Sequence, residues 1–429
     1  MRYNSLQEYF NNEKNKILEE CVKCSRCIEV CTNVKAFNLN KEQVRSLSQK
    51  LLDALSGGEL SDLVFRWVFG CNHCGLCLQA CPEGLDPLKR NDILRTEFLS
   101  QGNKKVSKMR DFLCDPLTGG FKKTIDIVQH LQMKSSETRW LTKISEKPRP
   151  VEVVLFLGCS GLLRPDLALS LIDIMETIGI NYLALGGVDF CCGMPFHMVG
   201  EINESEKHLK NLLESLNAFK PHIVLYACAE CLYLTTRFAP QIIDIPFKQD
   251  SILKFIADHL ECLEFKHPQP IKVTLHDSCG HGRLWGDYES PRKILNAIPG
   301  IELVEMKHAR HDSLCCGGAG EMFFPGKDKF LREMRMEEAQ ETGAKELVTI
   351  CVGCQSNYLK WEGNKPFGIT NIISLLGKAL GIEMEHVLEP FYLSKDIEDV
   401  LEKFKDNIET SNYTIDDYRM TVGKILGIN

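Results

Sequence analysis

Cysteines limit what this chain can fold into more than any other residue, because there are twenty in 429 residues and they recur at fixed spacings. Eight lie within residues 21–81, and ten of those within residues 159–354 recur in a matched pattern. The first residues, Met1 to Asn4, lead into a polar segment without an apolar signal region, so we expect a protein of the reducing cytoplasm. In that compartment, clustered cysteines indicate metal ligands or redox groups rather than disulfides.

The first eight cysteines form two groups with the spacing C-x2-C-x2-C-x3-C. They are Cys21, Cys24, Cys27 and Cys31, followed by Cys71, Cys74, Cys77 and Cys81. This spacing is typical of ferredoxins, in which three thiolates hold one [4Fe–4S] cubane and the fourth serves the other cubane. Zinc usually needs only two C-x-x-C pairs, which makes zinc the weaker alternative. The sequence therefore predicts two [4Fe–4S] cubanes.

The other ten cysteines form an internal repeat with the pattern C…CCG…C-x-x-C. The first copy is Cys159, Cys191, Cys192, Cys228 and Cys231, and the second, about 120 residues later, is Cys279, Cys315, Cys316, Cys351 and Cys354. Each copy offers five thiols, whereas a cubane takes four. Either one cysteine of each copy is spare, or the cluster is not a simple cubane. A redox dithiol at C-x-x-C alone is the other alternative, and it leaves three cysteines of each copy unexplained.

Short apolar, β-branched runs precede the cysteines in both copies of the repeat. They cover residues 151–157, 181–185 and 222–226, and then 271–275, 301–304 and 347–350. Helical patterns lie between them, including one that Pro165 begins and Gly179 ends. Strands that alternate with helices predict a parallel sheet in each copy. Since ligands collect beyond the carboxyl ends of parallel strands, each set of five thiols is expected at one rim.

These patterns predict an α-helical ferredoxin domain followed by a duplicated α/β domain with parallel sheets, flanking helices and a pseudo-twofold relation between the copies. The helical pattern of residues 41–55 and 61–69 resembles the α-helical ferredoxins of respiratory iron–sulfur subunits. The expected boundaries are 1–100 for the ferredoxin domain, 101–150 for a linker or packing segment, 151–265 and 266–365 for the two repeats, and 366–429 for a helical extension. Cys114 and Cys262 belong to no group and are expected to be buried structural thiols.

The duplicated CCG pattern resembles the cysteine-rich domain of heterodisulfide reductases, and its fusion to a ferredoxin resembles the D subunit of that family, in which both parts share one polypeptide. This resemblance implies that each set of five cysteines holds a noncubane [4Fe–4S] cluster, and that a disulfide is reduced there to two thiols. The family often has a proline before the first cysteine of the second motif, whereas this chain has Ser278. Iron–sulfur subunits of 2-hydroxyacid and glycerol-3-phosphate dehydrogenases and of benzoyl-CoA reductases share the layout. Electron relay to a partner subunit is therefore the alternative function.

Disulfide reduction consumes protons, and histidine is suited to deliver them near neutral pH. His276 and His281 flank Cys279 and are the predicted proton donors, the alternative being that they only hydrogen-bond backbone or sulfur. The glycines beside the vicinal cysteines do not form a dinucleotide motif.

Electrons are therefore expected from a flavin- or metal-containing subunit of a multi-subunit complex, or from a membrane cytochrome. No apolar run reaches the roughly 18–20 residues of a spanning helix, so the chain is expected in the cytoplasm or at the inner membrane face through a partner. A net charge of −7 gives no reason to expect nucleic acid.

Overall fold

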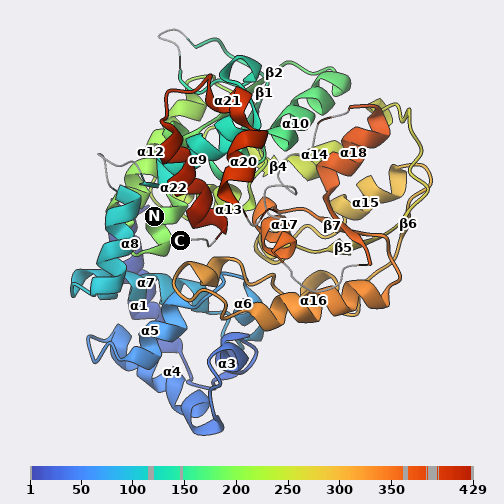
Figure 1. Cartoon of the computed structure of the whole chain (residues 1–429). Coiled ribbons are helices and arrows are strands. Elements are labelled where there is room, and N and C mark those ends of the chain that lie inside the picture. Colours follow the sequence, from blue (N-terminus) through green and yellow to red (C-terminus); the bar gives the residue numbers. More distant parts are fainter. Residues whose placement is uncertain are drawn as a thin grey trace.

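The chain folds into a helical N-terminal part and two parallel four-stranded sheets, as the computed structural model in Figure 1 shows. It describes residues 2–114, 120–144, 148–360, 366–382, 384, 394 and 396–426. Among these residues, no helix is both long enough and apolar enough to cross a bilayer.

Residues 2–100 contain only helices. They are α1 (Leu6–Glu20), α2 (Arg26–Glu29), α3 (Asn33–Ala36), α4 (Lys41–Leu55), α5 (Asp62–Phe69), α6 (Leu76–Ala80) and α7 (Pro87–Ser100). The predicted helices at 41–55 and 61–69 are present as α4 and α5. Both begin at a polar cap: the Asn40 side chain accepts from the Gln43 amide, and the Ser61 side chain accepts from the Val64 amide.

The two sheets have the same strand order. The first contains β1 (Val153–Gly158), β2 (Tyr182–Gly186), β3 (Ile223–Tyr226) and β4 (Lys248–Ser251), in the order β2-β1-β3-β4. The second contains β5 (Lys272–His276), β6 (Glu302–Leu303), β7 (Glu346–Thr349) and β8 (Gly368–Asn371), in the order β6-β5-β7-β8. All pairs are parallel, and the six strands that the sequence predicts are present. The second sheet also continues past residue 365, into the segment expected to be a helical extension.

Helices connect the strands and cover the sheets. They are α10 (Pro165–Ile178), α11 (Met194–Met198), α12 (Ile202–Asn217), α13 (Ala229–Arg237), α14 (Ile252–Ala257), α15 (Ser290–Ala297), α16 (Lys329–Glu341), α17 (Val352–Leu359) and α18 (Ile372–Leu380). Helix α10 begins at Pro165 and ends at Gly179, which adopts a left-handed conformation, as the sequence predicts.

Helices of the two repeats pack in equivalent pairs. Helix α10 of the first repeat lies against α18 of the second, and α15 of the second lies against α14 of the first. Helices α10 and α15 each follow the first strand of their repeat, whereas α14 and α18 each follow the fourth. Apolar residues of both sheets, including Leu155 and Leu275, therefore belong to one continuous core.

The segment between the two cysteine regions is folded rather than extended. It contains α8 (Lys104–Cys114) and α9 (Gly120–Gln132), and α9 packs against the C-terminal helices α20 (Ile397–Lys403), α21 (Lys405–Ile408) and α22 (Ile415–Leu426). Ile127 and Leu131 of α9 share a small buried core with Phe404 and Tyr418. Apolar burial thereby fixes the C-terminal helices on the segment that precedes the first repeat.

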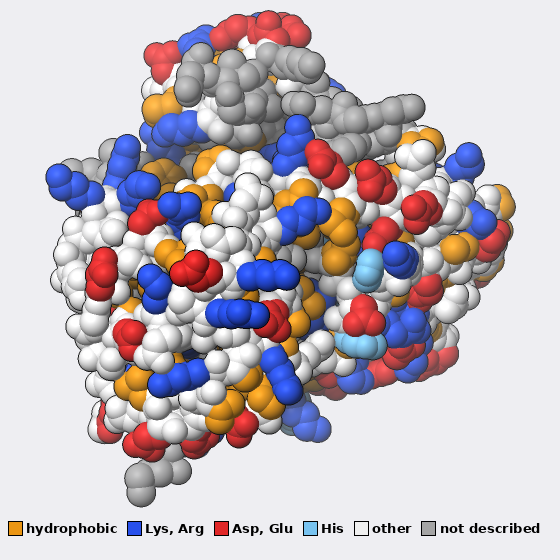
Figure 2. Space-filling model, turned by 90° about the horizontal axis from the view of Figure 1, so that it is seen from below, with side chains coloured by type: hydrophobic (Ala, Val, Ile, Leu, Met, Phe, Trp, Pro, Cys, Tyr) orange, Lys and Arg blue, Asp and Glu red, His pale blue; other side chains and the backbone are white. Residues whose placement is uncertain are grey.

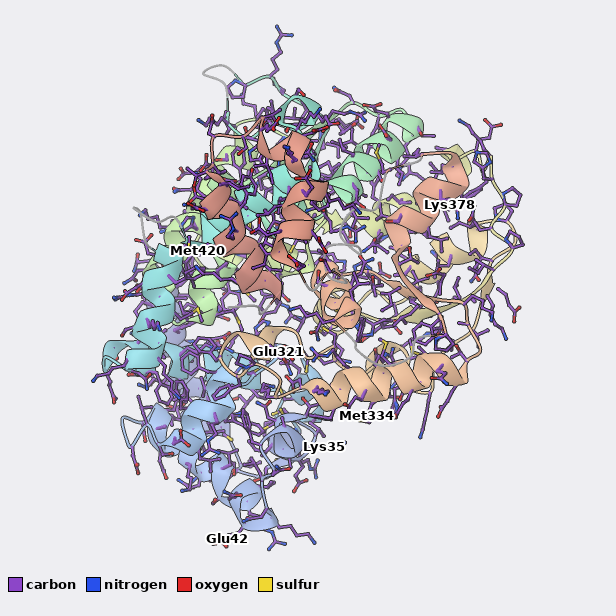
Figure 3. All side chains as sticks on the ribbon, in the orientation of Figure 1. Lys35, Glu42, Glu321, Met334, Lys378 and Met420 are labelled. Atoms are coloured by element: carbon purple, nitrogen blue, oxygen red, sulfur yellow. The ribbon has the colours of Figure 1, made fainter. Side chains whose placement is uncertain are left out.

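The N-terminal helices contact the two repeats in different ways. Phe10 of α1 packs its ring against Phe238, and this apolar core runs on into the first sheet. Contacts with the second repeat are both apolar and polar, and the ring centres of Phe69 and Phe323 lie 4.6 Å apart. Lys35 of α3 lies 3.8 Å from the Met334 sulfur and 4.6 Å from the ring centre of Phe330, both on α16 (Figure 3). On the underside of the molecule, cationic and anionic side chains are intermixed (Figure 2).

Candidate functional site

The two ferredoxin-type groups have the same local backbone. In each group, the residue before and the residue after the second cysteine adopt positive φ angles: Lys23 and Ser25 in the first, and His73 and Gly75 in the second. The short helices α2 and α6 follow, and they carry Cys27 and Cys77. These loops turn back sharply, which brings the successive thiols of a group toward one side. Helices α2 and α6 also pack against each other, so the two groups are neighbours.

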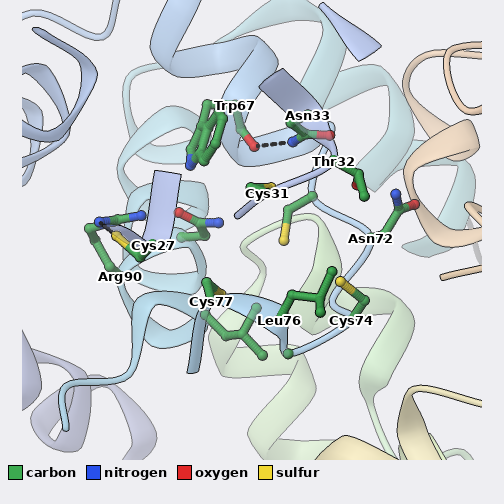
Figure 4. A pocket seen from close by; sticks show the side chains of 14 residues that line it. Cys27, Cys31, Thr32, Asn33, Trp67, Asn72, Cys74, Leu76, Cys77 and Arg90 are labelled. Atoms are coloured by element: carbon green, nitrogen blue, oxygen red, sulfur yellow. Dashed lines mark hydrogen bonds between the residues drawn. The ribbon is translucent and has the colours of Figure 1, made fainter. Parts of the chain in front are cut away.

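A pocket between these helices collects cysteines from both groups (Figure 4). Its lining includes Cys71, Cys74 and Cys77 of the second group together with Cys31, the fourth cysteine of the first. Cys27 of the first group also lines it. The structure therefore brings thiols of both groups to one pocket, and which cysteines share a cluster stays a prediction. Burial raises the pKa of the Cys77 thiol most, and the nearby Cys71 and Cys31 thiols raise it further.

The two groups differ in their exposure to solvent. Cys24 of the first group is exposed, whereas Cys71 and Cys74 of the second group are buried. One basic side chain reaches the first group, because Arg90 Nη1 lies 3.7 Å from the Cys27 sulfur. An electron partner at the surface would therefore meet the first group before the second.

The five cysteines of the first repeat follow the carboxyl ends of three adjacent strands. Cys159 comes directly after β1, the vicinal pair follows β2 through the short helix Val188–Phe190, and Cys228 is the N-cap of α13 after β3. The Cys192 thiol lies close to those of Cys191 and Cys231, and these two neighbours, Cys191 first, lower the pKa of Cys192 to about 6. The rim predicted from the sequence is therefore present in this repeat.

The second repeat places its five cysteines in the same way. Cys279 follows β5, the vicinal pair follows β6 through the short helix Arg310–Asp312, and Cys351 is the N-cap of α17 after β7. Interactions with Cys315 and then Cys354 lower the pKa of Cys316 well below its usual value. Two sets of five thiols thus lie at equivalent positions in the two sheets.

The two sets face each other. The turn Ser160–Leu163, after the first cysteine of repeat one, contacts α17 of repeat two, and the turn Gly280–Leu284, after the first cysteine of repeat two, contacts α13 of repeat one. Buried Arg164 joins the repeats by donating to Gln355 Oε1 at 2.6 Å. Glu230 lies where the sets meet: partial burial, together with the Cys228 and Cys351 thiols, raises the pKa of Glu230 to about 8.

A second contact joins the ferredoxin-type pocket to the second repeat. Interactions with Cys279, then Cys316 and then Cys74 raise the pKa of the Cys315 thiol well above its usual value. In turn, the interaction with Cys315 contributes most to lowering the pKa of the Cys74 thiol to about 6. Cys74 and Cys315 also belong to one small buried cluster with Leu331, so the two cysteine regions meet at this point. The sequence gives no sign of this, because Cys74 and Cys315 belong to different motifs far apart in the chain.

The glycine after each vicinal pair is explained by packing. Gly193 has φ +94°, and a Cβ there would lie 2.4 Å from the Ser205 carbonyl oxygen. Gly317 has φ +83°, and a Cβ there would lie 2.4 Å from the Asp328 Cβ. No side chain fits at either position. The CCG motif thus needs glycine so that the vicinal cysteines can turn beneath the following segment.

Gly193→Ala is expected to lower the melting temperature of the anaerobically purified protein far more than Gly57→Ala. Gly57 has the same φ of +94°, but a Cβ at this position would have no atom within 4 Å, so it reports the backbone cost alone, about 1 kcal/mol. The clash with Ser205 should add about 2 kcal/mol or more. Equal shifts in the two variants would contradict this account of the motif.

Both predicted proton donors are buried in the second repeat. Arg335 Nε donates to His276 Nδ1 at 3.2 Å, and the Tyr358 hydroxyl lies 3.3 Å from Nε2. Burial and then the charge of Arg335 lower the pKa of His276 to about 3, so its ring is neutral at pH 7. His281 lies 3.3 Å from the Ser251 hydroxyl of the first repeat and 3.3 Å from Asp287. Their role as donors stays a prediction.

Two cysteines lie outside the groups, as their spacing indicates. Cys262 was expected to be buried but is exposed, because it ends a short surface helix, Leu260–Cys262. The side chain of Cys114 lies outside the described residues. Arg164 and Arg283 stand near the first cysteine of each repeat, where the sequence marks them only as cations that could hold an anionic substrate and not as links between segments. Glu230, inside the C-x-x-C motif of the first repeat, is the residue whose position between the sets the sequence does not indicate.

The donor sets fit iron–sulfur clusters. Five cysteines line the pocket of Figure 4, and each repeat presents a further five at one rim. Thiolate-only sets of four or more are the ligands that such clusters take. Within the described residues, no three His, Cys, Asp or Glu side chains are arranged around a single metal ion.

Comparison with known proteins identifies the same three segments. A 4Fe-4S dicluster domain matches residues 17–85, and a cysteine-rich domain matches residues 153–234 and again 273–358. The D subunit of the dihydromethanophenazine:CoB–CoM heterodisulfide reductase of Methanosarcina barkeri is 27% identical over 85% of this chain and 94% of its own length. The chain is an iron–sulfur protein that resembles the D subunit of heterodisulfide reductases.

Other relatives of this heterodisulfide-reductase-like protein have different names. The B subunit of the fumarate reductase (CoM/CoB) of Methanothermobacter marburgensis is 25% identical over 86% of this chain and 73% of its own length. Lactate utilization protein A of Oceanobacillus iheyensis is 29% identical over 52% of this chain and 97% of its own length. The chain is accordingly an iron–sulfur oxidoreductase component of the heterodisulfide or fumarate reductase type.

Proposed function

We propose that this chain reduces a disulfide to two thiols between its two facing sets of five cysteines. The observation that supports this most is the equivalent placement of the sets, with the turn after the first cysteine of each repeat packed on the C-x-x-C helix of the other. We take this arrangement as a pseudo-twofold relation between the repeats. A mere electron relay needs neither five thiols per set nor two sets that face each other.

The proposed ligands follow the groups described above. Cys21, Cys24, Cys27 and Cys81 would hold one cubane, and Cys71, Cys74, Cys77 and Cys31 the other. The two sets of five would each hold a noncubane [4Fe–4S] cluster. When bound, the clusters would supply the one-electron carriers that amino-acid side chains do not provide.

Electrons are proposed to enter at the exposed group and to leave through the second repeat. Cys24 is exposed, Cys74 is buried, and the Cys74 thiol meets Cys315. The donor would be a flavin- or metal-containing partner subunit, and a membrane cytochrome could feed that complex. Cys351 and Cys228 then lie on the two sides of the space between the repeats, with Glu230 beside both.

The reaction at that space takes up two electrons and two protons. The sulfur–sulfur bond breaks, and each sulfur leaves as a thiol. Of the two predicted proton donors, His281 is the better placed, because its contact with the Ser251 hydroxyl puts it where the repeats meet. His276, the other, has a neutral ring at pH 7 and thus no extra proton to release there. Relay to a partner that performs the substrate chemistry is the alternative function.

Iron analysis tests the ligand assignment. Anaerobically purified full-length protein is expected to contain about 16 Fe per chain, since four sets of cysteines would each hold four iron atoms. Zinc in place of iron would contradict the assignment. About 8 Fe, with ferredoxin-type spectra only, would restrict the clusters to residues 1–100 and contradict the role of the repeats.

Turnover separates the two functions. Mixed thiol disulfides would be supplied with a chemical reductant, and thiol formation would be measured alongside the cluster spectra. The disulfide hypothesis expects turnover, and expects added thiols to change the spectra of the repeats. Protein with a full iron content that turns over no disulfide, and whose spectra no thiol alters, supports the relay.

A further inference from the structure

Arg283 connects three segments that carry cysteines. It lies in the turn Gly280–Leu284, directly after Cys279. Its Nε donates to the carbonyl oxygen of Cys74 at 2.6 Å, and its Nη1 donates to the carbonyl oxygen of Ser313 at 2.6 Å and of His311 at 3.3 Å. One guanidinium group therefore ties the ferredoxin-type loop to both cysteine segments of the second repeat.

The remaining nitrogen of Arg283, Nη2, makes none of these hydrogen bonds. Within the described residues, Nη2 is buried and has no hydrogen-bond partner. Arginine keeps its proton in proteins, and the Cys74, Cys279 and Cys315 thiols lie near this side chain. The guanidinium thus remains a cation between the two cysteine regions, where it offsets negative charge on either side.

Other contacts hold the same loop without supplying charge at this point. Asn72 donates to Asp328 at 2.8 Å and accepts from the Gly320 amide at 2.8 Å. Gly75 lies so close to the second repeat that a Cβ there would be 3.0 Å from Leu284 Cδ2. The loop is therefore docked by several contacts. Among these, the hydrogen bonds of Arg283 join the backbone of Cys74 to the segment just before Cys315.

We propose that Arg283 is a positioning residue for electron transfer from the Cys71–Cys77 loop to the second set of five cysteines. Its two shortest hydrogen bonds keep the Cys74 and Cys315 thiols in contact, and its charge stabilises an added electron on either side. This inference rests on the proposed electron path, but it does not depend on the substrate being a disulfide. Transfer rates depend steeply on the separation and orientation of the two centres, so loss of the bonds is expected to slow the step.

The test compares Arg283→Gln, Arg283→Lys and the control Arg237→Gln in full-length, iron-loaded protein. Arg237 also donates to a carbonyl of this turn, that of Leu284, at 3.3 Å, but it has no hydrogen bond to Cys74. Reduced ferredoxin-type clusters would be generated by rapid mixing, and the arrival of electrons at the second repeat would be followed by rapid-freeze electron paramagnetic resonance. Reduction potentials of both groups would be measured by redox titration.

Arg283→Gln is expected to slow arrival by about tenfold to 100-fold and to shift the potentials of both groups downward. Arg283→Lys keeps the charge but cannot reach both carbonyls, so its potentials should stay near wild type while arrival is still slowed. Arg237→Gln should behave like wild type. Wild-type arrival rates in both Arg283 variants would overturn the proposal, as would loss of iron from both, which would make Arg283 a residue for cluster assembly. If the wild-type protein reduces no disulfide but Arg283→Gln still slows electron transfer, only the proposed substrate is contradicted.

Discussion

Alanine at Cys316 or Cys192 is expected to lower disulfide turnover by at least about 100-fold. Removing a residue that only hydrogen-bonds a metal ligand already costs up to about 100-fold, and removing a ligand should cost more. Each residue is the second of a vicinal pair whose thiol interacts with both its neighbour and the C-x-x-C motif, so its loss removes a central member of the set. Turnover of a mixed disulfide with a chemical reductant is the measurement. Cys262→Ala is the matched control, because Cys262 is exposed and lies outside every group.

The two variants should also differ from each other. Cys74 meets Cys315 of the second repeat, and Cys351 lies on the side of that repeat that faces Cys228. Electrons supplied through the ferredoxin-type groups should therefore reach the first repeat only through the second. In Cys192→Ala the second repeat should still become reduced, whereas in Cys316→Ala the first should stay oxidised. Reduction of the first repeat in Cys316→Ala would disprove a serial path.

Six of the eight strands in the described residues were predictable because they are short apolar runs that end at or shortly before cysteines. The other two, β4 and β8, are edge strands with the sequences Lys-Gln-Asp-Ser and Gly-Ile-Thr-Asn. Edge position alone does not explain why they were missed, since β2 and β6 are edge strands too; the difference is that β4 and β8 lack a continuous apolar run, which an edge strand can do without. Strand β4 is largely exposed at its start, and β8 alternates between buried and half-buried residues. Neither differs from a loop in sequence, so the sequence pattern places the end of the second repeat before β8.

The cysteine groups were predictable because their chemistry is encoded in local spacing. The contacts between groups were not, since they depend on where whole helices and sheets pack. Asn72 and Asp328, for example, are 256 residues apart and hydrogen-bond only because the second repeat lies against the ferredoxin-type loop. The same is true of Arg283 and Cys74. Single charged or amide residues give no periodic signal, so these positions emerge only from the assembled fold.

Asp92→Asn is expected to destabilise the protein by about 3–5 kcal/mol, the cost of leaving a buried charge without its partner. The Asp92 side chain is 1% exposed and pairs with Arg95 at 2.5 Å and with His197 Nε2 at 3.0 Å. Burial alone would raise the pKa of Asp92, but His197 and Arg95 lower it to about 2, so it is an anion at neutral pH. Asparagine removes that charge and leaves Arg95, which is fully buried, uncompensated.

The position of Asp92 makes the loss functional as well as structural. It lies on α7, its partner His197 lies on α11 just after the first CCG motif, and His73 of the second ferredoxin-type loop is 4.0 Å away. The melting temperature and the iron content of anaerobically purified protein should therefore fall together. Asp258→Asn, which breaks a half-exposed surface pair with Lys254, should cost no more than about 0.5 kcal/mol and no iron. Equal melting temperatures for Asp92→Asn and the control would show that the buried pair does not hold α7 and α11 together. The apolar contacts around Phe10 and Phe238 would then have to do so alone.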